Sequence, residues 1–169
     1  MTKSGLCGFN LSLQKVDDRY TWINKMIDLR FSIGELFDKL SEHKIQKDLK
    51  SDLKKLCDAL LDYVSKGHFE IYPKILELVE NASGRSFSIA RRAMPLIEQT
   101  SDYLMRFNDY YNVGSDELTG ILPNLPKDLK ELKKCLESRF RNEDRLIVGL
   151  RLVHAAVETP PISKTYAHT

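Results

Sequence analysis

Apolar residues recur every three or four positions over most of this chain, and that spacing places them on one face of an α-helix. The pattern predicts helices at about 17–40, 45–66, 69–80, 87–111 and 128–157. No stretch has the strict alternation of apolar and polar residues that is typical of a strand. Long helices joined mostly by short connections favour an all-α antiparallel bundle, with four main helices and one shorter helix.

Glycine and proline positions indicate where the helices end. Gly67 directly follows the second apolar stripe, at the place where a residue in the left-handed conformation commonly ends a helix. Residues 112–127 contain Gly114, Gly120, Pro123 and Pro126. We therefore expect this segment to be the longest irregular connection of the chain.

The composition fits one folded domain. The chain has 169 residues, of which 42% are hydrophobic and 30% charged, with only 8 Gly and 6 Pro, as in an ordinary globular protein. We expect a single domain over 1–169, with flexible ends at 1–16 and 160–169. Asp17 or Asp18 is the expected N-cap of the first helix.

The lack of a recognisable targeting signal and the small net charge restrict the kinds of partner. The first residues lack the cationic start and apolar core of a secretory signal, and no later stretch approaches the ~18 apolar residues of a membrane span. We therefore expect a cytoplasmic protein without a membrane partner. Because 26 basic and 24 acidic residues leave a net charge of only +2, direct binding of nucleic acid is not indicated.

Motifs of enzymes and metal sites are missing from the sequence. Cys7, Cys57 and Cys135 form no C-x-x-C pair, so we expect reduced thiols. Among the four histidines none belongs to the Glu-x-x-His pairs of di-iron bundles. Phosphate loops, H-E-x-x-H and G-x-S-x-G are also absent. We expect a non-enzymatic protein with no metal and no cofactor.

One stretch, residues 62–72 (DYVSKGHFEIY), places an acid and several aromatic residues at a predicted junction of two helices. Asp62 opposes the dipole of the preceding helix, so it either pairs with Arg30 or Arg139 or is displayed for a basic ligand. His68 either bonds backbone groups freed at the helix end or belongs to a site. The aromatic residues are either core or anchors for a protein partner.

A second stretch, residues 136–147 (LESRFRNEDRLI), mixes charged and apolar residues along one predicted helix. Arg139, Phe140 and Glu143 fall on a stripe close to the expected core. A charged pair there needs partners from another helix, because burying an unpaired charge is costly.

Both stretches resemble motifs of the Rsd/AlgQ family, the regulators of sigma D. Residues 62–76 are similar to the family's D-Y-x-S-x-G-H-F-x-x-Y segment, and residues 136–147 to its L-x-x-R-F-x-x-E-D-x-L-I segment. Residues 33–40 (IGELFDKL) and 94–100 (MPLIEQT) agree in order, and the likeness covers about 24–156.

The chain departs from the family pattern at two places. Asn24, Lys25 and Met26 stand where the family commonly has Asp-Arg-Trp, and Lys66 replaces the usual small residue before Gly67. If the first helix contributes to an interface, the first departure alters affinity or partner choice.

The resemblance implies a helical bundle that binds region 4 of the primary sigma factor and diverts it from core RNA polymerase and promoters. Sigma region 4 is a basic helix-turn-helix module, so its partner should offer acids around apolar residues. We expect charge from Asp62, Glu70, Glu143 and Asp144, and anchors from Phe69 and Tyr72. The full set of candidate partner-binding residues is Arg30, Asp62, Tyr63, Ser65, His68, Phe69, Glu70, Tyr72, Arg139, Phe140, Glu143 and Asp144.

Two other interpretations stay open. The resemblance also implies, as possible main partners, the phosphocarrier protein of the sugar phosphotransferase system and a ppGpp hydrolase. The other interpretation is a small-ligand or metal-binding bundle that uses Asp62, His68, Arg139 and Glu143.

Overall fold

The computed structural model describes residues 20–42, 48–82 and 84–158, and within them the chain is almost entirely helical. The α-helices are α1 (Thr21–Glu42), α2 (Leu49–Lys66), α3 (Tyr72–Glu80), α4 (Arg85–Tyr111), α5 (Ser115–Ile121) and α6 (Leu125–Glu158). A five-residue π-helical segment, Gly67–Ile71, joins α2 to α3; we call it the π turn. Since these residues contain no strand, the prediction of an all-α fold is confirmed.

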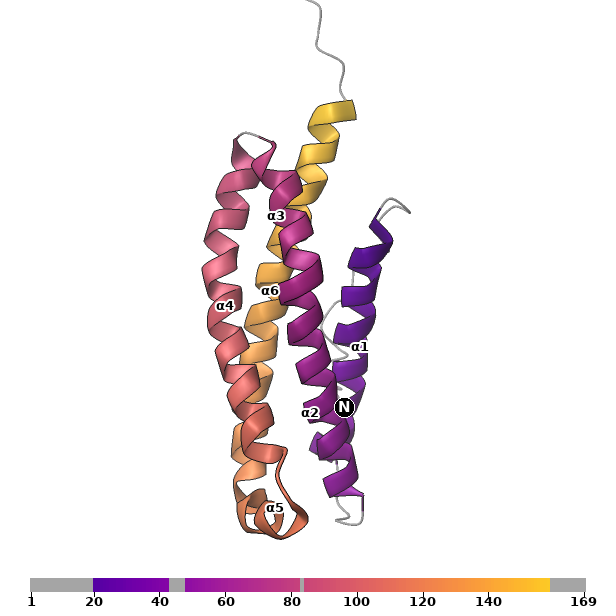
Figure 1. The fold of residues 1–169 in the computed structure, drawn as a ribbon, viewed down its shortest axis with the longest axis vertical. Coiled ribbons are helices and arrows are strands. Elements are labelled where there is room, and N and C mark those ends of the chain that lie inside the picture. Colours follow the sequence, from indigo (N-terminus) through magenta and orange to yellow (C-terminus); the bar gives the residue numbers. More distant parts are fainter. Residues whose placement is uncertain (1–19, 43–47, 83, 159–169) are drawn as a thin grey trace, which may run out of the picture.

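The long helices form an elongated antiparallel bundle (Figure 1). α1 and α4 run in one direction, while α6 and the continuous rod made of α2, the π turn and α3 run in the other (Figure 1). α4 packs most extensively on α6, and α2 lies between α1 and α4. The predicted antiparallel bundle is therefore confirmed for this part of the chain, whereas a single domain over 1–169 stays a prediction.

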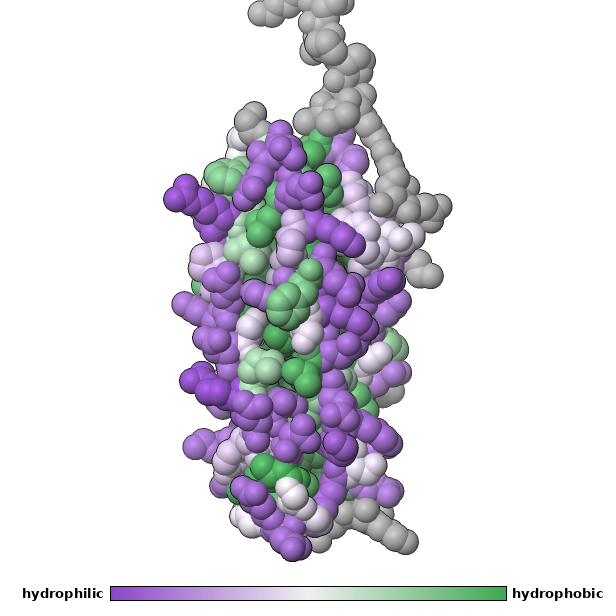
Figure 2. Space-filling view, in the orientation of Figure 1, coloured by the Kyte–Doolittle hydropathy of each residue, from purple (hydrophilic) through white to green (hydrophobic). Residues whose placement is uncertain are grey.

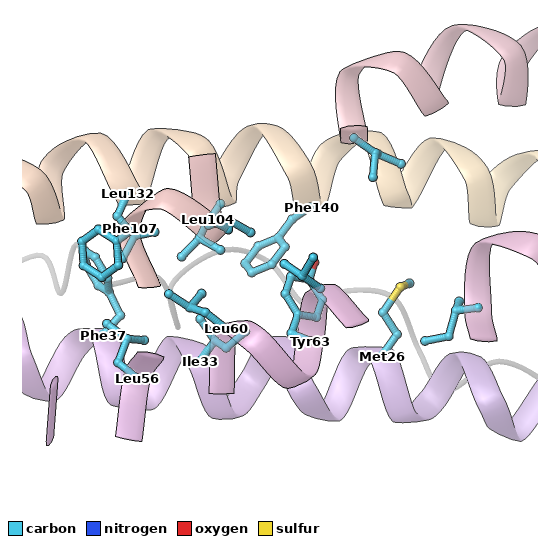
Figure 3. Close-up of a cluster of buried hydrophobic side chains, with 14 of the residues drawn as sticks. Met26, Ile33, Phe37, Leu56, Leu60, Tyr63, Leu104, Phe107, Leu132 and Phe140 are labelled. Atoms are coloured by element: carbon cyan, nitrogen blue, oxygen red, sulfur yellow. The ribbon is translucent and has the colours of Figure 1, made fainter. Parts of the chain in front are cut away.

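Apolar side chains from all four long helices meet along the axis of the bundle (Figure 3). Ile33 from α1, Leu60 from α2, Leu104 from α4 and Leu132 from α6 are each at most 1% exposed. Burying a side chain of this size contributes about 1.5–3 kcal/mol. The helical spacing seen in the sequence therefore corresponds to a shared core.

The face of the molecule in Figure 2 is mainly hydrophilic, with apolar patches between the charged side chains. Figure 2 shows such patches on the face along which α2 and α3 run. Among the described helices, none combines the length and the hydrophobicity needed to cross a bilayer.

Most helix bounds agree with the sequence prediction to within a few residues, and the last helix begins at Leu125 rather than near 128. The proposed N-caps Asp17 and Asp18 and the expected flexible ends lie outside the described residues, as does the predicted start of the second helix at 45.

The prediction that Gly67 ends a helix in the left-handed conformation is wrong. Its φ is −56° and its ψ is −54°, so the chain continues through it without a break. The positive φ occurs instead at Gly84, where φ is 105° and the chain turns from α3 into α4. Gly67 has a different role, which is described with the site below.

The prediction of an irregular connection over 112–127 is also wrong. The segment folds into α5 and a short 3₁₀ helix, Leu122–Asn124, that leads directly into α6. Pro123 and Pro126 both fall in the first turn of a helix, where a missing N–H is tolerated. Buried Leu118 and Leu125 attach the segment to the core.

Candidate functional site

Five polar side chains from four helices meet inside the bundle. Arg30 comes from α1, Tyr63 from α2, Tyr72 from the start of α3, and Arg139 and Glu143 from α6; we call this set the buried cluster. Arg139 and Glu143 are fully buried, and the other three are at most 3% exposed. A group of charges this deep in a core is unusual and needs partners for each member.

The carboxylate of Glu143 is the centre of the cluster. Its Oε2 accepts hydrogen bonds from Tyr63 Oη at 2.6 Å and from Arg30 Nε at 2.7 Å. Its Oε1 accepts a hydrogen bond from the hydroxyl of Tyr72. One buried carboxylate therefore connects α1, α2, α3 and α6.

Arg139 extends the cluster towards α4. Its Nη2 donates to Tyr72 Oη at 2.7 Å, and its Nη1 donates to Thr100 Oγ1 at 3.0 Å and Ser101 Oγ at 2.8 Å. Its Nε lies 3.2 Å from Glu143 Oε1 as an ion pair. Because α4 contributes these acceptors, every long helix of the bundle takes part in the network.

Arg30 carries the network from the interior to the surface. Its Nη1 donates to Asp144 Oδ1 at 2.6 Å, and the side chain of Asp144 is 38% exposed. The guanidinium also stacks over the Phe140 ring, 5.1 Å from its centroid. Two arginines thus face two carboxylates, so the local charge is balanced.

The surroundings shift the ionisation of Glu143 and both tyrosines. Burial by itself would raise the pKa of Glu143, but Arg30, Arg139 and the two tyrosine hydroxyls together hold that pKa below its ordinary value of 4.5. Burial, followed by the neighbouring carboxylate, raises the pKa of Tyr63 and Tyr72 far above the usual range. Glu143 is therefore ionised at neutral pH, while both phenols keep their protons.

The lowered pKa of Glu143 predicts a loss of stability in acid. The ionised form is favoured in the folded state, so its contribution is fully present above the ordinary, unfolded-state pKa of 4.5 and is lost as the pH falls through the lower folded value. We expect the difference in unfolding free energy between the wild type and Glu143→Gln to be largest at about pH 6 and to narrow towards about pH 3. Urea titrations of both proteins across this range measure it, and a constant difference would contradict the prediction.

The π turn brings Tyr63 and Tyr72 to the same carboxylate. In an uninterrupted α-helix, residues nine apart point in directions about 180° apart. The backbone N–H of Tyr72 instead bonds to the carbonyl of Gly67, five residues earlier, and the turn absorbs one extra residue. The two tyrosines then behave as if eight apart, at about 80°, which explains how both hydroxyls reach Glu143.

Gly67 is required by close packing at the start of this turn. A Cβ atom placed on Gly67 would lie 2.8 Å from Tyr72 Oη and 2.9 Å from the adjacent ring carbon Cζ. Such approaches are too short for any other residue type, because the phenol is fixed by Glu143 and Arg139. The glycine of the motif therefore makes room for a side chain, and its φ is ordinary.

The middle of the π turn faces outward. Phe69 is 77% exposed, the highest value among the exposed large hydrophobic side chains of the described residues. The His68 ring lies edge-on to it with 5.0 Å between centroids. Glu70 is exposed as well, and Ser65 is half-buried one helical turn earlier. A buried aromatic side chain is ordinary core, whereas a large aromatic side chain exposed to solvent can mark a surface that binds a partner.

The structure divides the twelve candidate residues into two groups. Half of them lie in the interior: Arg30, Tyr63, Tyr72, Arg139, Phe140 and Glu143. The other half reach the surface fully or in part: Asp62, Ser65, His68, Phe69, Glu70 and Asp144. The role of any of them in binding a partner stays a prediction.

The structure corrects four detailed expectations about these residues. Glu143 does not add charge to the surface, and Tyr72 is no exposed anchor, because the cluster encloses both. Asp62 is 49% exposed and pairs with Lys66 at 2.8 Å rather than with an arginine. His68 caps no helix end, since the chain continues as a helix through it.

Sequence analysis missed the contribution of α4. Thr100 and Ser101 accept hydrogen bonds from Arg139, and the carbonyl of Ile97 does so at 3.2 Å. The available signal was a threonine within an otherwise apolar helical stripe, where a buried hydroxyl needs a partner.

The residues of the alternative small-ligand or metal site are not brought together. Arg139 and Glu143 are enclosed, whereas Asp62 and His68 are exposed on the rod formed by α2 and the π turn. In the described parts of the chain, no three His, Cys, Asp or Glu side chains are grouped as metal ligands would be.

The two described cysteines are not in activating surroundings. Burial raises the pKa of the Cys57 thiol to about 12 and that of Cys135 to about 11. A reactive cysteine needs the opposite shift, because the thiolate is the nucleophile.

Comparison with known proteins supplies independent information. A family model described as "Regulator of RNA polymerase sigma(70) subunit, Rsd/AlgQ" matches residues 10–151. Proteins named "Regulator of sigma D" from Yersinia enterocolitica and Yersinia pestis are 33% and 32% identical over 98 residues, which is 56% of this chain and 56% of each relative. One from Salmonella paratyphi B is 34% identical over 100 residues, 57% of each chain. The match thus spans little more than half the length of these relatives.

Proposed function

The chain belongs to the Rsd/AlgQ family of regulators of the RNA polymerase sigma 70 subunit, and from this premise we propose that it binds region 4 of the primary sigma factor and keeps it from core polymerase and promoters. Binding is stoichiometric, with no turnover and no cofactor. The proposed partner belongs to the transcription machinery, so the place of action is the cytoplasm.

The observation that carries this proposal is the exposed aromatic side chain of the π turn. Phe69 projects from a segment whose two ends are buried, so it is presented on a rigid base. Rigid aromatic side chains make effective anchors, because they bury much area and lose little conformational freedom. The proposed sigma-binding surface comprises this side chain and the exposed neighbours of the same rod: Asp62, Ser65, His68, Phe69 and Glu70.

The charges of this surface suit a basic partner. Asp62 and Glu70 lie on either side of the exposed aromatic ring in sequence, and both are exposed. Within residues 62–70 the one lysine or arginine is Lys66, and it is paired with Asp62 at 2.8 Å. A helix-turn-helix module that normally grips DNA phosphates is basic, so acids next to an apolar anchor favour its approach and register.

Titration calorimetry against isolated sigma region 4 at physiological salt tests the proposal. We expect saturable one-to-one binding with a dissociation constant of about 1 μM or tighter. The absence of heat and of any complex would contradict the proposal, and the phosphocarrier protein would then be tested in the same way. If both bind, competition between the purified partners identifies the principal one.

Replacing Phe69 by alanine should weaken binding to region 4 about tenfold, because a buried aromatic anchor typically carries a large share of the binding energy. The fold should be unaffected, since the ring is mostly in solvent. Phe87→Ala is the matched control, because Phe87 is an exposed phenylalanine on α4, outside the π turn. Equal affinity of Phe69→Ala and the wild type for region 4 would show that Phe69 is not part of the proposed sigma-binding surface.

A further inference from the structure

The exposed part of the π turn is connected directly to the buried cluster, because both ends of the turn are buried. The turn begins at Gly67, against which the Tyr72 phenol packs, and it ends at Ile71, which is 3% exposed. The residues between them, His68 to Glu70, are exposed. The conformation of the exposed part is therefore set by how its ends are held.

The ends are held by hydrogen bonds rather than by apolar packing alone. The Tyr72 hydroxyl donates to Glu143 and accepts from Arg139 Nη2 at 2.7 Å. Tyr63, on the other side of the turn, donates to the same carboxylate at 2.6 Å. Both tyrosines reach Glu143 only while the turn keeps its extra residue, because a regular α-helix would direct them about 180° apart.

A π turn is less favourable than a regular helix and persists only where its surroundings enforce it. Without the Tyr72 hydroxyl, Glu143 would keep Tyr63, Arg30 and Arg139 as partners, and no bond to the carboxylate would tie the far end of the turn to one register. A shift of register by one residue rotates the exposed residues by about 100° around the rod. Phe69 would then point in another direction.

We propose that the buried cluster holds the π turn in register and thereby sets the position of Phe69, so that Tyr72, Arg139 and Glu143 act as positioning residues for sigma binding without touching the partner. This inference rests on the proposed function for its effect on affinity. Its effect on the turn itself does not depend on any partner.

Tyr72→Phe tests the proposal, since it keeps the ring beside Gly67 and removes only the hydroxyl. Affinity for region 4 should fall about fivefold in the wild-type background and should be unchanged when the same substitution is made in Phe69→Ala. This coupling distinguishes positioning from a general loss of stability, which would leave the affinity of the folded protein unaltered. Equal losses in both backgrounds, or no loss in either, would overturn the positioning role.

Tyr111→Phe is the matched control. Tyr111 is also buried, at 2% exposure, and its hydroxyl also donates to a carboxylate, that of Asp128, at 2.6 Å. It joins α4 to α6 near α5, away from the π turn. We expect a similar loss of thermal stability with unchanged affinity for region 4.

Amide hydrogen exchange provides a measurement that needs no partner. Exchange at residues 68–72 should accelerate about tenfold or more in Tyr72→Phe and stay as in wild type in Tyr111→Phe. Unchanged exchange there would overturn the proposal even if sigma binding is normal. If wild-type protein does not bind region 4, the proposed function fails, while accelerated exchange would still support control of the turn by the cluster.

Discussion

Replacing Glu143 by glutamine should lower the free energy of unfolding by about 3–5 kcal/mol at neutral pH, because it leaves two arginine guanidiniums in the core without their shared counter-charge. Glutamine keeps the size of the side chain, so the loss reports on charge rather than on a cavity. The two tyrosine hydroxyls would retain an amide oxygen for only one of their two hydrogen bonds. Denaturant titration followed by circular dichroism measures the change.

Glu131→Gln is the matched control for this substitution. Glu131 is on the same helix, is 51% exposed and pairs with Lys134 at 2.8 Å. Exposed pairs of this kind contribute little, so the change should stay below about 0.5 kcal/mol. A loss in Glu143→Gln as small as in this control would mean that the buried charges do not depend on one another.

Replacing Gly67 by alanine should lower the free energy of unfolding by about 2 kcal/mol, although alanine is ordinarily the better helix residue. Overpacking a filled site costs about 1–3 kcal/mol, and displacing the Tyr72 phenol also strains its bonds to Glu143 and Arg139. The helix preference of alanine returns only about 1 kcal/mol. Thermal and denaturant unfolding of the purified variant measure the net effect.

Gly120→Ala is the corresponding control and should act in the opposite direction. Gly120 is an exposed residue of α5, and a Cβ atom there would have no other atom within 4 Å. Stability should rise by about 0.5–1 kcal/mol through helix preference alone. If both alanines stabilise the protein, the close contact at Gly67 does not constrain the fold.

The helices of the bundle could be predicted from the sequence because their apolar residues repeat at the period of an α-helix. That same assumption hid the π turn. The apolar positions on either side of Gly67 predict two separate helices, and the glycine predicts the end of the first, whereas the chain continues through it as one rod. An inserted residue and a chain reversal both interrupt the periodicity, and the structure distinguishes them by the helical φ and ψ of Gly67 and by the bond from the Tyr72 N–H to the Gly67 carbonyl.

The sequence predicts which residues belong to the buried cluster better than it predicts which motif residues face the core and which face the solvent. The sequence placed Arg139 and Glu143 on a stripe near the core and required partners from another helix, and the structure supplies these from α1, α2, α3 and α4. Which motif residue faces inward could not be read from one sequence. Phe69 and Tyr72 are both aromatic and three residues apart, yet one is exposed and the other is enclosed.

The expected departure from the family pattern at Asn24, Lys25 and Met26 lies in the core as well as at the surface. Met26 is fully buried, whereas Lys25 is exposed and Asn24 is half-buried. A change at the buried position alters how α1 packs on its neighbours, and the flexible side chain of methionine fits irregular spaces well.

The bond between Arg30 and Glu143 joins residues 113 positions apart in the chain. During synthesis the ribosome makes α1 first and α6 last, so a growing chain presents the arginine long before its counter-ion exists. α1 cannot complete its docking until the final helix arrives. A product that ends before α6 therefore lacks Glu143, which is the shared partner of Arg30, Tyr63 and Tyr72.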